Sequence, residues 1–230
     1  MSASNGTRTP LPGGTPGLGL LGGTFDPVHL GHLRAAEEVR RLFALAWVEF
    51  LPAGTPPHKT DRPTTEVSHR LAMLQEALRG QPHFRLSEAE ACRHGLSYLV
   101  DTLKEYRRHC PAPSPLFFIM GMDSFREIAT WHNFPELFSL SHFVVLSRPG
   151  YPRPELAEAV GPELAGRFTA YAGPPDYLEH PSGHRVYFQE TLFLEISSSQ
   201  VRSLIRQGRD ASHLVPAGVL AYIREKNLYR

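Results

Sequence analysis

The chain has 230 residues, of which 41% are hydrophobic and 20% are charged, and its formal net charge is +1. This composition is that of an ordinary soluble globular protein, and the near-neutral charge provides no general field that would attract nucleic acid or a membrane surface. The sequence has no run of about 18 apolar residues, so no membrane span is predicted. Two cysteines, Cys92 and Cys110, are too few for a disulfide framework, so we expect free thiols and a cytoplasmic location.

The N-terminal segment differs in composition from the rest of the chain. Residues 1–17 are rich in Ser, Thr, Gly and Pro and lack the apolar core of a signal peptide. We expect this segment to be a disordered tail and residues 18–230 to form a single domain.

Short apolar runs alternate with amphipathic stretches along the domain. Strands are expected at 18–21, 47–51, 84–86, 116–120, 143–146 and 186–196, and helices at 32–45, 68–78, 97–108, 124–129, 198–207 and 215–228. Ser68 and Ser97 are expected as N-caps. The segment 152–183 is the least regular, and we expect one helix at 155–164 followed by a loop rich in Gly, Pro and His.

This alternation predicts the fold class. Continuous apolar strands separated by amphipathic helices are typical of an α/β, Rossmann-like nucleotide-binding fold, with a mostly parallel sheet covered by helices on both faces. In such sheets ligands collect at the carboxyl ends of the strands. We therefore expect the strand ends at Gly22, Pro52, Gly121 and Ser147 to line one crevice.

The most informative segment is residues 22–32, GGTFDPVHLGH, at a predicted strand-to-helix turn. Two glycines let backbone N–H groups approach an anion, and the new helix directs its positive end to the same place. His29 and His32 are three residues apart, so both face one side of the first helical turn. The segment predicts a phosphate cradle with two imidazoles that stabilise developing charge. A metal site is the alternative, but no nearby Cys or carboxylate cluster completes it.

A second candidate anion site is the segment 196–202, ISSSQVR. Serines before a helix are ordinary caps. Three in a row, with Arg202 one turn into the helix, combine hydroxyls, helix N–H groups and a guanidinium. Together with the first cradle, this segment suits a nucleoside triphosphate.

Further candidates follow other predicted strands or begin a helix. His58 and Lys59 lie in a proline-rich loop after the second strand and are either ordinary exposed residues or groups that reach over the crevice. Asp123 either binds ribose hydroxyls or caps the next helix, and Trp131 is either core or a stacking platform. Free N–H groups near Ser97 and Tyr98 suit a carboxylate.

In this order the motifs resemble a known family. Residues 22–32 resemble the signature of nucleotidyltransferases with an H-x-G-H motif. Together with 56–59, 97–103, 121–123, Trp131, 148–150, 196–202 and the ending 214–229, they are similar to the bacterial nicotinate-nucleotide adenylyltransferases. The resemblance covers about residues 18–230; it departs at Leu96, where relatives often have proline, and at 152–183, which is longer and richer in Pro and Gly.

The resemblance implies a reaction in which nicotinate mononucleotide attacks the α-phosphorus of ATP in line, giving deamido-NAD and pyrophosphate. It implies catalytic roles for His29, His32 and Arg202. It implies ATP binding by Gly22, Gly23, Thr24, Phe25, His29, His32, Gly121, Asp123, Ser198, Ser199, Val201 and Arg202, and mononucleotide binding by His58, Lys59, Ser97, Tyr98 and Trp131. Mg²⁺ is expected to arrive with the ATP phosphates rather than in a protein cage. The expected partners are these two small molecules, without nucleic acid or membrane, and a homo-oligomer is left open.

Other functions use the same histidine motif. An enzyme that transfers AMP to phosphopantetheine, or CMP to an alcohol phosphate, gives no reason for Trp131 or for the carboxylate site near Ser97 and Tyr98. A variant that prefers the nicotinamide mononucleotide is the nearest rival within the family. A non-catalytic nucleotide sensor is the alternative from another class, although neither histidine of the motif is missing.

Overall fold

A computed structural model describes residues 16–54, 64–93, 95–109, 114–147, 152–173, 175–191 and 196–230. The expectations for the N-terminal tail up to residue 15, for His58 and Lys59, for Cys110 and for residues 148–150 lie outside the described residues.

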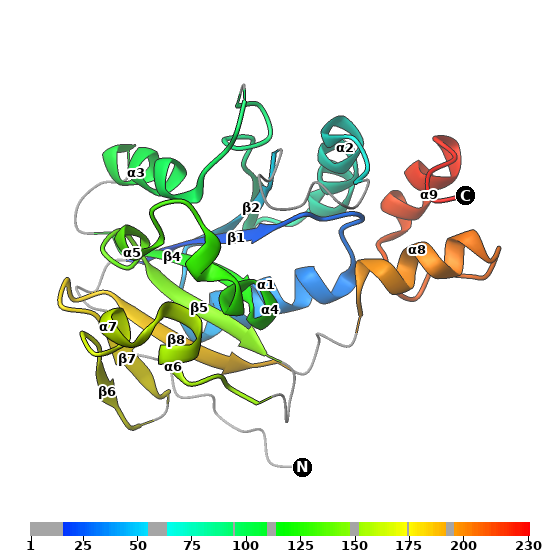
Figure 1. Cartoon of the computed structure of the whole chain (residues 1–230). Helices are drawn as coiled ribbons and strands as arrows, with labels where there is room; N and C mark the ends of the chain where they lie inside the picture. Colours follow the sequence, from blue (N-terminus) through cyan, green and yellow to red (C-terminus); the bar gives the residue numbers. More distant parts are fainter. Residues whose placement is uncertain are drawn as a thin grey trace, which may run out of the picture.

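A single twisted sheet forms the middle layer (Figure 1). Its strands have the order β3-β2-β1-β4-β5-β8-β7-β6. From β3 to β8 all neighbours pair in parallel, and β7 and β6 are added antiparallel at one edge. The bounds are β1 Leu18–Gly23, β2 Trp47–Pro52, β3 Phe84–Leu86, β4 Leu116–Gly121, β5 His142–Ser147, β6 Thr169–Tyr171, β7 Tyr177–Glu179 and β8 Arg185–Glu190. The predicted mostly parallel sheet is confirmed.

Helices cover both faces of the sheet, as predicted. One apolar cluster joins one face to α1 (Leu30–Leu42), α2 (Val67–Leu78), α8 (Ser198–Arg206) and α9 (Ala217–Glu225). A second cluster joins the other face to α3 (Leu99–His109), α4 (Met122–Arg126), η1 (Ile128–Thr130), α5 (Phe134–Leu137), α6 (Leu156–Val160) and α7 (Pro162–Ala165). Alternate residues of the central strands therefore face two separate cores, which explains their continuous apolar sequences.

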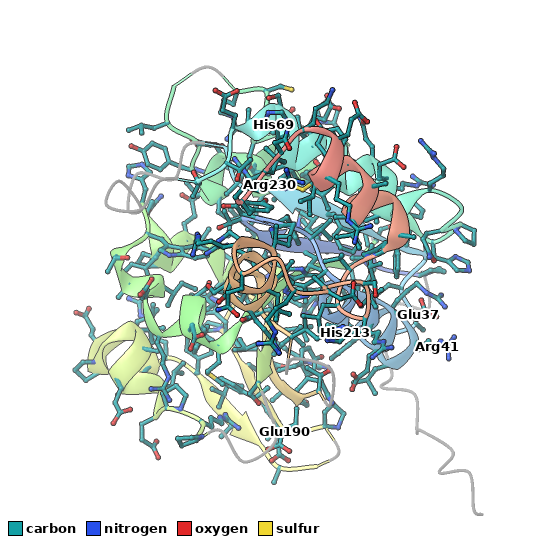
Figure 2. The ribbon with its side chains drawn as sticks, turned by 90° about the vertical axis from the view of Figure 1, so that its right-hand side faces the viewer. Glu37, Arg41, His69, Glu190, His213 and Arg230 are labelled. Carbon is teal, nitrogen blue, oxygen red and sulfur yellow. The ribbon has the colours of Figure 1, made fainter. Side chains whose placement is uncertain are left out.

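Helices α2 and α9 pack against each other, although many residues of the chain lie between them. Figure 2 shows His69 of α2 near this C-terminal region, and its Nδ1 lies 2.9 Å from the hydroxyl of Tyr222 on α9. The C-terminal helices therefore form part of the same layer as α2 and lie next to the first strand-to-helix turn.

Both predicted serine caps are wrong. Helix α2 begins after Glu66, so Ser68 lies inside its first turn. Helix α3 begins at Leu99, where the carbonyl of Tyr98 accepts the first helical hydrogen bonds, while the hydroxyl of Ser97 accepts from Arg93 instead. The guanidinium of Arg93, four residues earlier, therefore binds the hydroxyl that the local pattern assigned to a cap.

The segment 152–183 also differs from the prediction. The expected helix is split into α6 and α7 by Gly161, whose φ of +79° interrupts the helical path. Part of the expected loop forms β6 and β7, which pair with each other and then with β8. Each strand has only three residues, so its period is too short to recognise without its partners. Downstream, β8 and α9 are shorter than expected.

Candidate functional site

A candidate ligand site is a cavity of about 180 Å³ at the carboxyl ends of β1, β2 and β4. The strand order changes direction between β1 and β4, and ligands in open α/β sheets bind at this switch point. Its lining residues are Gly22, Gly23, Thr24, Leu51, Ala53, Gly54, Glu90, Ser97, Tyr98, Leu99, Phe118, Met120, Ser124, Glu127, Trp131 and His132. Of the four predicted strand ends, Gly22 lines the cavity itself, while Leu51, Ala53 and Met120 line it beside Pro52 and Gly121.

The fourth predicted strand end does not line this cavity. Ser147 ends β5, one strand further from the switch point, and its carbonyl accepts a hydrogen bond of 2.9 Å from the backbone N–H of Thr191. The expected crevice is therefore narrower than predicted and is centred on β1 and β4.

The glycines at the end of β1 are required by close packing. A Cβ at Gly22 would lie 2.5 Å from Cζ of Phe118, and one at Gly23 would lie 2.9 Å from Cζ of Phe25. Phe25 itself is buried at a φ of +52°, a conformation that non-glycine residues adopt rarely and at a cost of about 1–3 kcal/mol. The β1–α1 loop (residues 24–29) therefore keeps its backbone in an unusual path beside the cavity.

The two histidines of the motif lie together at the start of α1. His29 is the N-cap, so the helix begins at Leu30, earlier than expected. The two rings stack with centroids 3.6 Å apart and planes 20° apart. Nδ1 of His32 accepts a hydrogen bond of 3.2 Å from the backbone N–H of His29, and Phe25 packs edge-on against His32 at 5.0 Å. This pairing fixes both rings beside the glycine turn.

Burial keeps both imidazoles neutral. It lowers the pKa of His29 to about 4, and burial together with the neighbouring His29 lowers the pKa of His32 well below its usual value. The Nδ1 atom of His29 is buried and has no hydrogen-bond partner among the described residues. Since neutral imidazole carries one N–H donor and one acceptor, each ring offers a single polarised donor rather than a full charge.

The second candidate anion site packs directly onto the first. Ser197 caps α8, and its Oγ accepts from the backbone N–H of Gln200 at 3.1 Å. The hydroxyl of Ser198 donates to the carbonyl of Pro27 at 2.9 Å. Both predicted phosphate segments therefore meet, and α8 supports the β1–α1 loop.

Arg202 belongs to the same contact. Its guanidinium donates to the carbonyl of Asp26 and, at 3.3 Å, to the hydroxyl of Ser199. The side chain of Val201 is fully buried and packs α8 against the core. The structure thus brings the α8 residues to the histidine side of the site; their contact with ATP stays a prediction.

Gly121 and Asp123 lie at the end of β4 and the start of α4, and neither is among the residues that line the cavity. Both are exposed, and Gly121 is the N-cap of α4, so Asp123 lies in the first turn and the alternative that it caps the helix is wrong. The adjacent residue Ser124 lines the cavity. The contact of Gly121 and Asp123 with a ribose stays a prediction.

Three predicted mononucleotide residues come together in the cavity: Ser97, Tyr98 and Trp131. The ring of Tyr98 lies 4.3 Å from that of His132, and Trp131 is half-buried with Phe118 edge-on to it at 6.4 Å. These residues come from two separate segments on the α3 side of the sheet. Their convergence makes an apolar wall with polar groups at one end.

Sequence reasoning missed a polar network behind this wall. Glu90 is buried and lines the cavity, its Oε1 accepts from the hydroxyl of Thr102 at 3.1 Å, and burial raises the pKa of its carboxyl. Arg93 donates to the hydroxyls of Ser97 and Thr102, each at 3.1 Å. The only sequence signal is the Glu-x-x-Arg spacing shortly before Ser97.

The described residues contain no group of three or more His, Cys, Asp or Glu side chains that could hold a metal ion. Within the same part of the chain, each helix is too short or too polar to cross a membrane.

A switch-point cavity lined by a glycine turn is typical of a nucleotide-binding α/β protein, and the model of the family described as "Cytidylyltransferase-like" matches residues 20–204. Relatives described as "Probable nicotinate-nucleotide adenylyltransferase" include one from Citrifermentans bemidjiense, 43% identical over 212 residues, 92% of this chain and 97% of the relative. Another, from Geobacter metallireducens, is 43% identical over 211 residues, with 92% and 97% covered. The chain belongs to the nicotinate-nucleotide adenylyltransferase family.

A solved structure shows the same fold. It is described as Plasmodium falciparum nicotinic acid mononucleotide adenylyltransferase complexed with NaAD, with a TM-score of 0.69, 18% identity and coverage of 94% of this chain and 98% of that one. The Rossmann-like architecture inferred from the sequence is therefore also that of a nucleotidyltransferase known in three dimensions.

Proposed function

We propose that this protein transfers the adenylyl group of ATP to nicotinate mononucleotide, giving deamido-NAD and pyrophosphate in NAD biosynthesis. The observation that carries the proposal is the cavity in which the glycine turn, Gly22 to Thr24, meets Ser97, Tyr98 and Trp131. A cradle for phosphates and a pocket for an aromatic acid thus share one wall. The membership of the family supports the same reaction.

On this proposal ATP lies along the β1–α1 loop and the N-terminus of α8. The backbone of Gly22 to Phe25 and the N–H donors of His29 and His32 face its phosphates. Ser198, Ser199 and Arg202 bind the triphosphate, and Gly121 and Asp123 bind the ribose. Hydrogen bonds from these groups strengthen as negative charge grows on the departing pyrophosphate. Because α8 is bonded to the loop through Pro27 and Asp26, both sets of donors act as one rigid unit.

The mononucleotide occupies the other half of the cavity. Trp131 stacks on the pyridine ring, and amides near Ser97 and Tyr98 receive the nicotinate carboxylate. We also assign His58 and Lys59 to the phosphate of the mononucleotide.

The reaction needs alignment more than acid–base chemistry. An oxygen of the mononucleotide 5′-phosphate forms a bond to the α-phosphorus while the bond from that phosphorus to the bridging oxygen of pyrophosphate breaks. The nucleophile is already ionised, so no general base is required, and positioning with charge stabilisation suffices. We infer that Mg²⁺ enters as part of the substrate, bound to the ATP phosphates. The cytoplasmic location expected from the two cysteines stays a prediction.

The decisive experiment measures pyrophosphate release from ATP with nicotinate mononucleotide or nicotinamide mononucleotide. We expect turnover with a strong preference for the acid, because a buried polar site left unpaired by the wrong substrate discriminates by several kcal/mol. Equal rates would identify the amide-tolerant alternative. Pyrophosphate release only with phosphopantetheine would assign the related transferase instead, and no release with any acceptor would leave a nucleotide sensor.

A further inference from the structure

Helix α2 carries a cation on its buried face, among apolar side chains. Arg70 is only 3% exposed and lies on the same face as Met73, Leu74 and Ala77, which are also buried. The preceding residue, His69, instead contacts α9 (Figure 2). A buried guanidinium is retained only when its donors are satisfied, so its partners reveal what it holds.

Four backbone carbonyls accept hydrogen bonds from this guanidinium. Nη1 donates to Thr24 at 2.9 Å and to Ala53 at 2.9 Å. Nη2 donates to Gly54 at 3.3 Å, and Nε donates to Thr65 at 3.0 Å. One side chain therefore ties together the loop after β1, the turn after β2 and the segment that leads into α2.

Three of these acceptors belong to residues that line the cavity: Thr24, Ala53 and Gly54. Arg70 itself is not a lining residue, so it lies behind the wall and contacts it only through backbone oxygens. On the other side of the same turn, a Cβ at Gly54 would lie 2.4 Å from the carbonyl oxygen of Glu90. The turn is thus held between the Arg70 guanidinium and the Glu90 backbone.

The same support extends to the centre of the β1–α1 loop. The backbone N–H of Thr65 donates to Oδ2 of Asp26 at 3.3 Å. Thr65 therefore bonds Arg70 through its carbonyl and Asp26 through its N–H. The attraction between Arg70 and the Asp26 carboxylate adds to this connection.

We propose that Arg70 is a positioning residue for adenylyl transfer: its guanidinium fixes the cradle at Thr24 against the turn at Ala53 and Gly54, and so sets the alignment of the two substrates. This inference rests on the proposed function. Arg70 touches neither substrate and acts only through the two loops that line the cavity.

Lysine cannot replace arginine in this role. The guanidinium presents five donors in a fixed planar fork, whereas an ammonium group is a compact point with three donors. Arg70→Lys keeps the charge but cannot reach carbonyls on three separate segments at once. The loops then gain freedom relative to each other, and a misplacement of about 1 Å costs on the order of 100-fold in rate.

The test compares kcat, the KM of each substrate and the Kd of each substrate alone for wild type, Arg70→Lys and Arg79→Lys. Arg79→Lys is the matched control, because it makes the same change near the end of α2 at an exposed ion pair with Glu76. For Arg70→Lys we expect kcat to fall by at least about 30-fold while each Kd changes by less than about threefold. The control is expected to match wild type.

A second variant, Gly54→Ala, displaces the turn from its other side and leaves Arg70 in place. We expect the same loss in kcat, and this variant decides the question if Arg70→Lys does not fold. The inference is overturned if the Arg70→Lys protein folds and its kcat stays within about threefold of the wild-type value. If Arg70→Lys does not fold, the same kcat criterion applies to Gly54→Ala. A loss seen only in KM also overturns the inference. Failure of the proposed function is distinct, since wild type would then release no pyrophosphate.

Discussion

The hydroxyl of Tyr229 donates a hydrogen bond of 2.6 Å to Oδ1 of Asp26, a residue 203 positions earlier in the sequence. Burial and the neighbouring carboxylate both raise the pKa of Tyr229, so its hydroxyl remains a donor throughout the working pH range. Asp26 is itself buried, and its backbone carbonyl accepts from Arg202. The C-terminal segment and α8 therefore hold the middle of the β1–α1 loop from two sides.

Replacing Tyr229 by Phe is expected to destabilise the protein by about 1–3 kcal/mol, because the buried carboxylate of Asp26 loses a donor. Urea unfolding of wild type and variant measures the difference. Tyr171→Phe is the control, since Tyr171 is exposed and stacks on Tyr177, and its stability is expected to stay within about 0.5 kcal/mol of wild type. Equal stability of Tyr229→Phe and wild type would mean that the hydrogen bond contributes nothing net.

His32 is expected to have two separable roles. His32→Ala removes the ring that accepts from the backbone of His29 and is expected to lower stability by about 1 kcal/mol and kcat by roughly 100-fold or more. His32→Gln places at N3 a residue that is known to bond the N-cap N–H. We expect it to regain most of the stability but not the activity, as measured by thermal unfolding and pyrophosphate release. Activity that returns together with stability would leave the ring with a structural role only.

Trp131→Ala is expected to raise the KM for nicotinate mononucleotide by roughly tenfold, because stacking on an aromatic side chain is worth about 1–3 kcal/mol per base. The KM for ATP should change little, since Trp131 lies on the α3 side of the cavity. Trp47→Ala is a matched control. Trp47 is the first residue of β2, at the end of the strand away from the cavity, and packs under Arg85. A Trp131→Ala enzyme with an unchanged KM for the mononucleotide would remove this residue from the binding pocket.

The protein is expected to lose stability as the pH falls below about 6.5. Burial is the main reason that the pKa of His142 is lowered to about 3, with His184, Arg107 and Arg185 adding repulsion. Because the unfolded chain binds a proton more readily, the neutral ring contributes stability above pH 6.5, and this is lost as the pH falls toward the folded pKa. The loss from His142 alone is roughly 2 kcal/mol between pH 6.5 and 5, by the usual conversion of pKa into free energy.

His142→Asn tests this assignment. Nδ1 of His142 accepts from the backbone N–H of Arg185 at 3.1 Å, and an asparagine carbonyl offers an acceptor that does not titrate. Urea unfolding at pH 7, 6 and 5 is expected to show a shallower decline for the variant than for wild type. Parallel declines would show that other groups cause the acid sensitivity.

In the helix that carries Arg70, the local sequence pattern predicts the helix but not the face that is buried. The period of Leu71, Leu74 and Leu78 correctly predicts a helix, but the face that is buried is the one with Arg70, Met73 and Leu74, while Leu71 and Leu78 are half-buried. Hydrophobic spacing alone cannot place a cation inside, because the acceptors that make its burial tolerable come from other segments. Glu90 was not predicted either, because the hydroxyl that donates to its carboxylate belongs to Thr102 on another segment.

The sequence by itself determined the class of fold, the glycine turn and the spacing of His29 and His32, because apolar periodicity, turn chemistry and helical spacing are properties of neighbouring residues. Only the tertiary structure decided that β6 and β7 extend the sheet, that Ser147 lies away from the cavity, and that Tyr229 and Arg70 support the loops around it. These outcomes depend on strand pairing and hydrogen bonds between residues far apart in the chain, and such contacts exist only once the chain has folded.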